Sequence, residues 1–289
     1  MNTLDLTTDP ASRKRAIKEA WISYPDANAI VAVLEELLKE DKEIRPRCLA
    51  IIGEANYGKS HLVTRFAERH TTAYDPNVDS PVQPVLCVEL PGDCTPAAFL
   101  RTLIHGTGAP VNLREPNDEM MRRLCLLIKE LQTKLVLIDE FHNGFKGTHR
   151  QQMIMLNLTR ELSNRTRIPM AVAGIEDVDH FIRNDSQLDQ RFRRIHLGSW
   201  KEDDQTRRLL KTFEDHFQLK NPSRLASLAM TKKIVELTEG KLGRISFLLK
   251  ACAVEAINDG SELITEALLV TMSKKLPASD ASLTMAAAM

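Results

Sequence analysis

A short apolar run followed by two glycines and a lysine limits most strongly how this chain can fold. Residues 48–52 read Cys-Leu-Ala-Ile-Ile and lead directly into Gly53-Glu54-Ala55-Asn56-Tyr57-Gly58-Lys59-Ser60. An apolar run that ends at a glycine is typical of a buried parallel strand. The glycines let the backbone turn so that its N–H groups point inward at a phosphate, and a helix that begins there adds its dipole. The sequence therefore predicts a phosphate-binding loop between a parallel strand and a helix.

Strand and helix patterns alternate from this loop to about residue 197, and the pattern then changes. The alternation predicts a parallel sheet with helices on both faces, a three-layer αβα fold. After Trp200 every period is helical, which indicates a separate helical subdomain. We expect a flexible N-terminus at 1–12, a core at 13–199 with an N-terminal helical segment at 13–45, a small C-terminal lid at 200–274, and a flexible tail at 275–289.

The composition limits how this chain could bind nucleic acid and in which cellular compartment it is expected. The 289 residues carry 39 Lys and Arg against 39 Asp and Glu, so a globally basic surface is excluded and any nucleic-acid contact must come from a local patch. Five scattered cysteines without a Cys-x-x-Cys pair indicate reduced thiols. No apolar run approaches the ~20 residues that span a bilayer. We expect a cytoplasmic protein with no membrane contact and, because no histidine has metal-ligand spacing, no zinc site.

Two acids complete the chemistry that the loop begins. Asp139 and Glu140 follow the apolar run Leu135-Val136-Leu137-Ile138, and ligands collect at the carboxyl ends of parallel strands. Acidic strand ends are common by themselves, but the upstream loop favours a catalytic role. The pattern predicts ATP with Mg²⁺: Lys59 contacts the β- and γ-phosphates, Ser60 and Asp139 hold the metal, and Glu140 orients the attacking water.

Arginines supply two further candidates. Arg191 lies in Gln187-Leu188-Asp189-Gln190-Arg191-Phe192-Arg193-Arg194 and is our choice for an arginine that a neighbouring subunit contributes to the phosphates, with Arg193 and Arg194 as alternatives. A solvated basic turn is the competing interpretation. Arg244, at the start of a helix in the C-terminal part, could reach the phosphates or have only structural contacts. Tyr24, before Pro25, could stack near adenine or simply pack.

In this order, these elements resemble an AAA+ ATPase, and more narrowly the TniB/TnsC family of transposition regulators, relatives of MuB. The resemblance covers about residues 13–272. The resemblance rests on five sequence motifs: Trp21-Ile22-x-Tyr24-Pro25, the loop Gly53–Ser60, Ile138-Asp139-Glu140-Phe141-His142-Asn143, Ala173-Gly174-Ile175-Glu176 and Asp185-x-Gln187-Leu188-x-x-Arg191-Phe192.

The resemblance implies an ATPase that assembles with ATP into rings or helical filaments on double-stranded DNA, marks a target site, and recruits the transposase together with a target-selection protein. ATP between subunits would meet Arg191 in trans, and hydrolysis would drive disassembly. The implied nucleotide contacts are Gly53, Glu54, Ala55, Asn56, Tyr57, Gly58, Lys59, Ser60, His61, Arg244, Tyr24 and Pro25.

One position departs from the superfamily, since Gly174 stands where many AAA+ proteins carry a polar sensor. That role is left unassigned, or is carried by a Thr or Asn elsewhere. Arg101, Lys146 and Arg150 are the DNA-contact candidates, and each could also be an ordinary solvated charge. The alternatives are a protein-remodelling motor, for which Gly144-Phe145-Lys146-Gly147 superficially offers a pulling loop, an ATPase like replication initiators, or a non-hydrolysing nucleotide-gated scaffold.

Overall fold

The computed structural model describes residues 9–40, 43–71 and 82–276, and these form two compact units. The sheet unit comprises Asp26–Glu54 and Lys59–Leu197. The helical unit comprises Met1–Pro25, Ala55–Gly58 and Gly198–Met289. Residues 1–8 and 277–289, most of the two segments expected to be flexible, lie outside the described residues.

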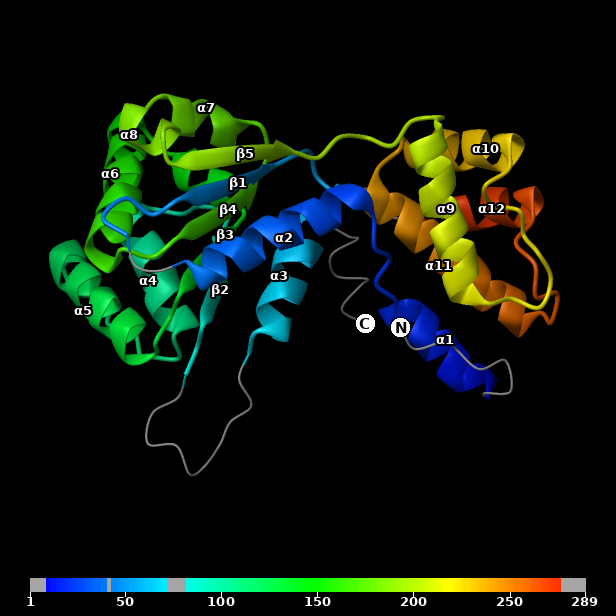
Figure 1. Ribbon diagram of the computed structural model, residues 1–289, viewed down its shortest axis with the longest axis horizontal. Coiled ribbons are helices and arrows are strands. Elements are labelled where there is room, and N and C mark those ends of the chain that lie inside the picture. The colour runs from blue at the N-terminus through cyan, green and yellow to red at the C-terminus, as the bar shows by residue number, and fades with distance from the viewer. Residues whose placement is uncertain (1–8, 41–42, 72–81, 277–289) are drawn as a thin grey trace. The chain divides into compact units, whose positions relative to one another are not determined.

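The sheet unit is built on five strands whose pairings are all parallel (Figure 1). Their order, β2-β3-β4-β1-β5, brings the carboxyl ends of β3 and β4 beside the end of β1, from which the glycine-rich loop departs. The strands are β1 (Cys48–Ile52), β2 (Val85–Glu89), β3 (Leu135–Asp139), β4 (Met170–Gly174) and β5 (Phe192–His196). The three-layer αβα prediction is confirmed, and the apolar runs at 48–52 and 135–138 form β1 and β3.

Helices cover both faces of this sheet because successive side chains of a strand point to opposite sides. On one face α3 (Lys59–Arg69) contacts β2, β3 and β4, and α2 (Pro25–Lys39) lies beside it, where Glu35 and His70 approach to 3.1 Å. On the other face a continuous core joins the strands to α4 (Pro96–Gly106), α5 (Asn117–Glu130) and α6 (His149–Thr166).

Three short elements of the sheet unit were not predicted. They are the 3₁₀ turn η1 (Phe141–Phe145) and the helices α7 (Asp177–Arg183) and α8 (Ser186–Asp189). Each is too short to show a helical period, which needs a window of about 11 residues or more. Residue Asp185, whose carboxylate accepts the N–H groups of Gln187 and Leu188, is the local signal that starts α8.

The helical unit consists of α1 (Pro10–Glu19), α9 (Asp204–Phe217), α10 (Leu228–Thr238), α11 (Leu242–Asn258) and α12 (Glu266–Ser273). The expectation of a flexible segment through residue 12 was wrong for its last three residues. Asp9 caps α1 by accepting the Ser12 N–H at 3.4 Å, and Pro10 occupies the first helical position.

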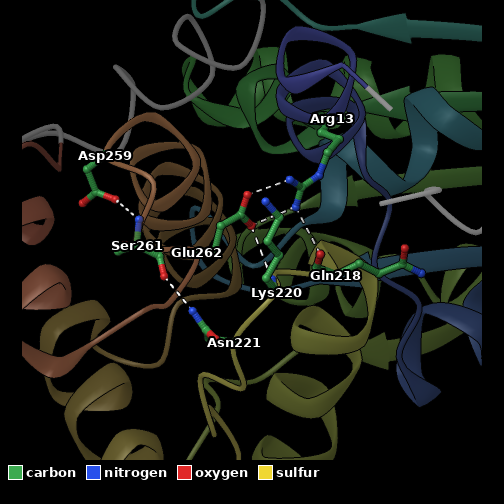
Figure 2. Close-up of polar contacts among 7 residues, drawn as sticks. All are labelled: Arg13, Gln218, Lys220, Asn221, Asp259, Ser261 and Glu262. Carbon is green, nitrogen blue, oxygen red and sulfur yellow. Dashed lines mark hydrogen bonds and ion pairs between the residues drawn. The ribbon is translucent and has the colours of Figure 1, made fainter. Parts of the chain in front are cut away.

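A buried ion pair holds α1 to the C-terminal helices (Figure 2). Arg13 donates from Nη1 to Glu262 Oε1 at 2.7 Å and from Nη2 to Glu262 Oε2 at 3.0 Å, and Nη2 also reaches the Gln218 carbonyl at 3.1 Å. Lys250 donates to the Ala20 carbonyl at 2.8 Å, just beyond the end of the same helix. Residues 13–25 therefore group with the C-terminal helices, whereas the sequence led us to expect them in the core.

Candidate nucleotide-binding site

Lys59 begins α3 and is turned back on the loop that precedes it. Its ammonium is 5% exposed and donates to the carbonyls of Gly53 at 2.6 Å and Glu54 at 2.8 Å. Burial lowers the pKa of Lys59, and the carboxylates of Asp139 and Glu140 oppose that shift. The loop is also fixed to the sheet, because the Gly53 N–H donates to the Gly174 carbonyl at 3.1 Å. Lysine and acids thus lie at one edge of the sheet. In the same first turn of α3, Ser60 is half-buried and His61 is exposed.

The tip of the loop, Ala55–Gly58, belongs to the helical unit. The Gly243 N–H, in the first turn of α11, donates to the Asn56 carbonyl at 2.7 Å. Gly58 has a φ of +88°, and a Cβ there would lie 3.1 Å from Leu242 Cδ2 and 3.6 Å from the Tyr24 hydroxyl. A larger residue at position 58 would therefore be strained and crowded.

Two expected nucleotide contacts also have partners inside the helical unit. The guanidinium of Arg244 forms an ion pair with Glu239. Tyr24 is 5% exposed and packs edge to face on Trp200, with the ring centroids 5.6 Å apart. These contacts give both side chains a structural role.

The acids lie at the carboxyl end of β3. Asp139 is 4% exposed, and its Oδ1 accepts the Glu140 N–H at 2.8 Å. Glu140 has a left-handed backbone with φ of 52°, which is costly for a non-glycine residue. Burial and the neighbouring Asp139 carboxylate raise the pKa of Glu140, while Lys59 opposes the shift. The site therefore resists a second negative charge.

Sequence reasoning missed Glu89 as a member of this edge. Glu89 ends β2 in register with Asp139, and burial together with the charges of Asp139 and Glu140 raises its pKa. The signal was present, because an acid that ends one parallel strand meets the acids that end its neighbour. Without the strand order, however, β2 and β3 could not be called neighbours.

The two polar residues after the acids face this edge as well. Asn143 donates from Nδ2 to the Leu90 carbonyl at 3.0 Å and so connects η1 to the end of β2. His142 Nε2 lies 3.4 Å from Glu140 Oε2. Burial, followed by the charges of Lys146 and Lys59, lowers the pKa of His142, so the imidazole is neutral at physiological pH.

The three arginines around β5 have different surroundings. Arg191 donates to the Ser163 hydroxyl of α6 at 3.2 Å. Arg194 pairs with Asp179 at 2.5 Å and with Asp189. Arg193 is exposed, and no polar contact involves it among the described residues. Arg194 is thus the most constrained of the three and Arg193 the least.

The three DNA-contact candidates differ in whether their side chains are already bonded within the protein. Arg101 donates to the Leu113 carbonyl at 2.8 Å and so fixes the connection between α4 and α5. Lys146 and Arg150 are exposed on either side of Thr148, whose side chain caps α6. Lys146 follows η1 directly, and Arg150 lies in the first turn of α6.

Ser60 and Asp139 fit the small number of ligands that a protein usually supplies to Mg²⁺. Magnesium prefers oxygen ligands and usually binds through one or two side chains together with phosphate and water. One hydroxyl and one carboxylate match that preference, and no cluster of three or more His, Cys, Asp or Glu side chains able to hold a metal occurs in the described part of the chain. Nor does that part contain a helix long and apolar enough to cross a membrane.

Fold and site together define a nucleotide-binding protein of the AAA+ class. The Aeropyrum pernix ORC2 protein, in a structure with ADPNP and ADP, superposes with a TM-score of 0.62 at 18% identity over 91% of this chain and 72% of that one. Cdc6p from Pyrobaculum aerophilum gives 0.60 at 15% identity over 92% and 72%. The A. pernix ORC1 protein, solved in complex with DNA, gives 0.61 at 14% identity over 91% and 69%.

The family is narrower than the fold. The model of the bacterial TniB protein family matches residues 13–202, and the chain belongs to that family. No curated protein matches the sequence. Family and fold make the chain an ATPase of the AAA+ class. Both the AAA+ prediction and the narrower family prediction are confirmed.

Proposed function

We propose that this ATPase regulates transposition by assembling, with ATP and Mg²⁺, on double-stranded DNA. In this proposal the assembly is a ring or helical filament that marks the target site, receives a target-selection protein and recruits or activates the transposase. Hydrolysis then drives disassembly. The observation that supports it best is the TniB family match, which spans both the phosphate-binding loop and the acids of β3. Action on DNA in the cytoplasm accords with the absence of a membrane-spanning helix among the described residues.

The site residues divide the chemistry among themselves. Loop N–H groups and Lys59 would bind the phosphates, and Ser60 and Asp139 would hold the metal. Mg²⁺ would neutralise charge on the phosphate oxygens. Glu140 would accept a hydrogen bond from the attacking water and orient it for attack. The raised pKa of Glu140 favours such a role, because a carboxylate poised nearer neutral pH is a better base.

Assembly would complete the site. An arginine given in trans stabilises charge on the transferring phosphoryl group and is worth about 10³–10⁵ in rate in well-studied cases. Arg191 is our first choice because its contact, one neutral hydroxyl at 3.2 Å, is weak enough to exchange for a phosphate. Arg193 is the alternative that the geometry favours, since it is exposed. The two carboxylates on Arg194 argue for a structural role.

DNA would be held by phosphate contacts repeated along the assembly. The neutral net charge requires a local basic patch, and Lys146 with Arg150 supplies one exposed patch per subunit. Arg101 remains a weaker candidate because its guanidinium is already hydrogen-bonded to a carbonyl.

One alternative is weakened by a specific contact. A remodelling motor would need an exposed aromatic loop that grips its substrate, and Phe145 was the candidate. Phe145 is 3% exposed and stacks on Phe181 with ring centroids 4.0 Å apart. An ATPase like replication initiators remains the second candidate, because the solved structures with similar folds include ORC and Cdc6 proteins, one of them solved in complex with DNA.

Electron microscopy with duplex DNA, with and without a slowly hydrolysed ATP analogue, tests the proposal. We expect nucleotide-dependent rings or filaments on DNA that Lys59→Ala abolishes and that Lys146→Ala with Arg150→Ala weakens. Arg101→Ala, at the weaker candidate whose guanidinium is already bonded to the Leu113 carbonyl, should reduce DNA binding less than the double variant. Equal DNA binding without nucleotide, or single particles under all conditions, would overturn it.

A further inference from the structure

Among the described residues, the side-chain contact of the Glu140 carboxylate within ion-pair distance is with His142, while the charges of Asp139, Lys59 and Lys146 also act on it. The carboxylate is about one-third exposed, and its Oε2 lies 3.4 Å from His142 Nε2. The backbone around it is held separately: the Glu140 N–H donates to Asp139 Oδ1 at 2.8 Å, and the Glu140 carbonyl accepts the Asn143 N–H at 2.9 Å. Main-chain contacts therefore fix where the side chain starts, and the contact with His142 bears on where it ends.

Gly174, at the end of β4, leaves the room that the imidazole occupies. A Cβ at position 174 would lie 2.6 Å from Val178 Cγ2, 3.2 Å from His142 Nδ1 and 3.4 Å from the His142 backbone nitrogen. Any side chain there would press on the ring that faces Glu140. Gly174 leaves the end of β4 without a polar side chain, and this gives room there for the polar side chain of His142 from the turn after β3.

The protonation pattern of the pair follows from donor counting. A neutral imidazole has one N–H donor and one acceptor, and an ionised carboxylate can only accept. A hydrogen bond between them therefore requires the proton on Nε2. Nδ1 then carries a lone pair, which agrees with its being buried without a hydrogen-bond partner among the described residues. Burial and the charges of Lys146 and Lys59 keep the ring in its neutral form by lowering its pKa.

We propose that His142 is a positioning residue that holds the Glu140 carboxylate toward the attacking water, in the place beside Gly174 where a polar sensor is otherwise expected. The inference rests on the proposed role of Glu140 in hydrolysis. It adds the residue that aims this carboxylate and gives a reason for glycine at position 174.

A matched pair of substitutions separates the polar contact between His142 and Glu140 from packing. His142→Gln keeps an N–H donor of similar reach, and His142→Met keeps comparable bulk without one. We expect His142→Met to lower the ATP turnover number by about 10- to 100-fold, because small misplacements of a reacting group cost rates of that order. Affinity for a slowly hydrolysed ATP analogue should not change, and His142→Gln should restore a large part of the turnover.

The Glu140→Gln background distinguishes this inference from the function on which it rests. If Glu140 orients the water, Glu140→Gln is nearly inactive and adding His142→Met lowers the rate no further. Normal turnover in Glu140→Gln would contradict the role of Glu140 itself. An inactive Glu140→Gln together with full activity in His142→Met, or equal loss in the Met and Gln variants, would overturn the positioning role alone.

A second variant, at the end of β4, tests the contact between His142 and Glu140 independently. Gly174→Ala should displace the imidazole and lower turnover at unchanged analogue affinity, and it should have no further effect in a His142→Met protein. Losses that multiply in the double variant would mean that the two residues act independently, which would also overturn the inference.

Discussion

A group of buried charges in the helical unit and the group at the end of β3 in the sheet unit differ in how far their members satisfy one another. In the helical unit Arg13 and Glu262 satisfy each other: both guanidinium nitrogens reach the carboxylate, and the Lys220 N–H donates to it at 3.4 Å. The hydrogen bond between them raises the pKa of Arg13 and lowers that of Glu262, so each stabilises the charge of its partner.

At the end of β3 the pKa values shift in the opposite direction. Burial lowers the pKa of Lys59 and raises that of Glu140, and the Asp139 charge adds to the shift at Glu140. These side chains are therefore buried without enough partners of their own. Perturbed pKa values of this kind gather at functional sites, because the missing partner is the ligand. We infer that the first group holds the helical unit together and that the second serves the proposed chemistry.

The largest expected effect comes from Glu140→Gln. Turnover should fall by about 10²–10⁴-fold, the usual contribution of a general base, while ATP still binds and assemblies on DNA persist. The melting temperature should stay the same or rise, because the change removes a carboxylate that repels Asp139. Phosphate release and thermal unfolding measure the two effects. Normal phosphate release, or a clear loss of stability, would erase the contrast between the two groups.

Arg13→Ala should do the reverse. Removing one member of a buried ion pair leaves the other charge uncompensated, which typically costs about 3–5 kcal/mol. Denaturant unfolding of the full chain should show this loss in the transition of the helical unit. Arg15→Ala is the control, since Arg15 lies on the same helix but is exposed and pairs with Glu19 of that helix at 2.8 Å. If both variants unfold alike, the Arg13 pair is not what holds α1.

The sequence predicts one of these groups far better than the other. The loop at Gly53–Ser60 and the acids after β3 are short, contiguous motifs, and each has a known chemical role. Both follow strands of a parallel sheet, so the sequence places them at the same edge. Arg13 and Glu262 are 249 residues apart, and nothing local in either segment indicates a partner. Their pairing explains why the prediction assigned α1 to the wrong unit.

The same limit applies inside the site. Gly174 could be read as a missing sensor, but filling its place with His142 requires knowing that β3 and β4 are neighbours in register. Glu89 needs the corresponding knowledge of β2 and β3. Periodicity gives the elements, whereas contacts between the ends of strands depend on the sheet order. Short elements such as α8 fall below the length at which periodicity can be read.

The smallest effect concerns pH and tests the pairing of Glu262 directly. Its pKa in the folded chain lies below the ordinary value of 4.5, first because of the hydrogen bond from Arg13. The stabilisation is therefore complete above pH 4.5, where the unfolded chain is also ionised, and is lost as the pH falls through the folded pKa. Over that acidic range the free energy of unfolding should fall more steeply in the wild type than in Glu262→Gln, which cannot titrate. Equal acid slopes in the two proteins would mean that the carboxylate of Glu262 is no better satisfied in the folded chain than in the unfolded one, and the contrast with Glu140 would fail on this side.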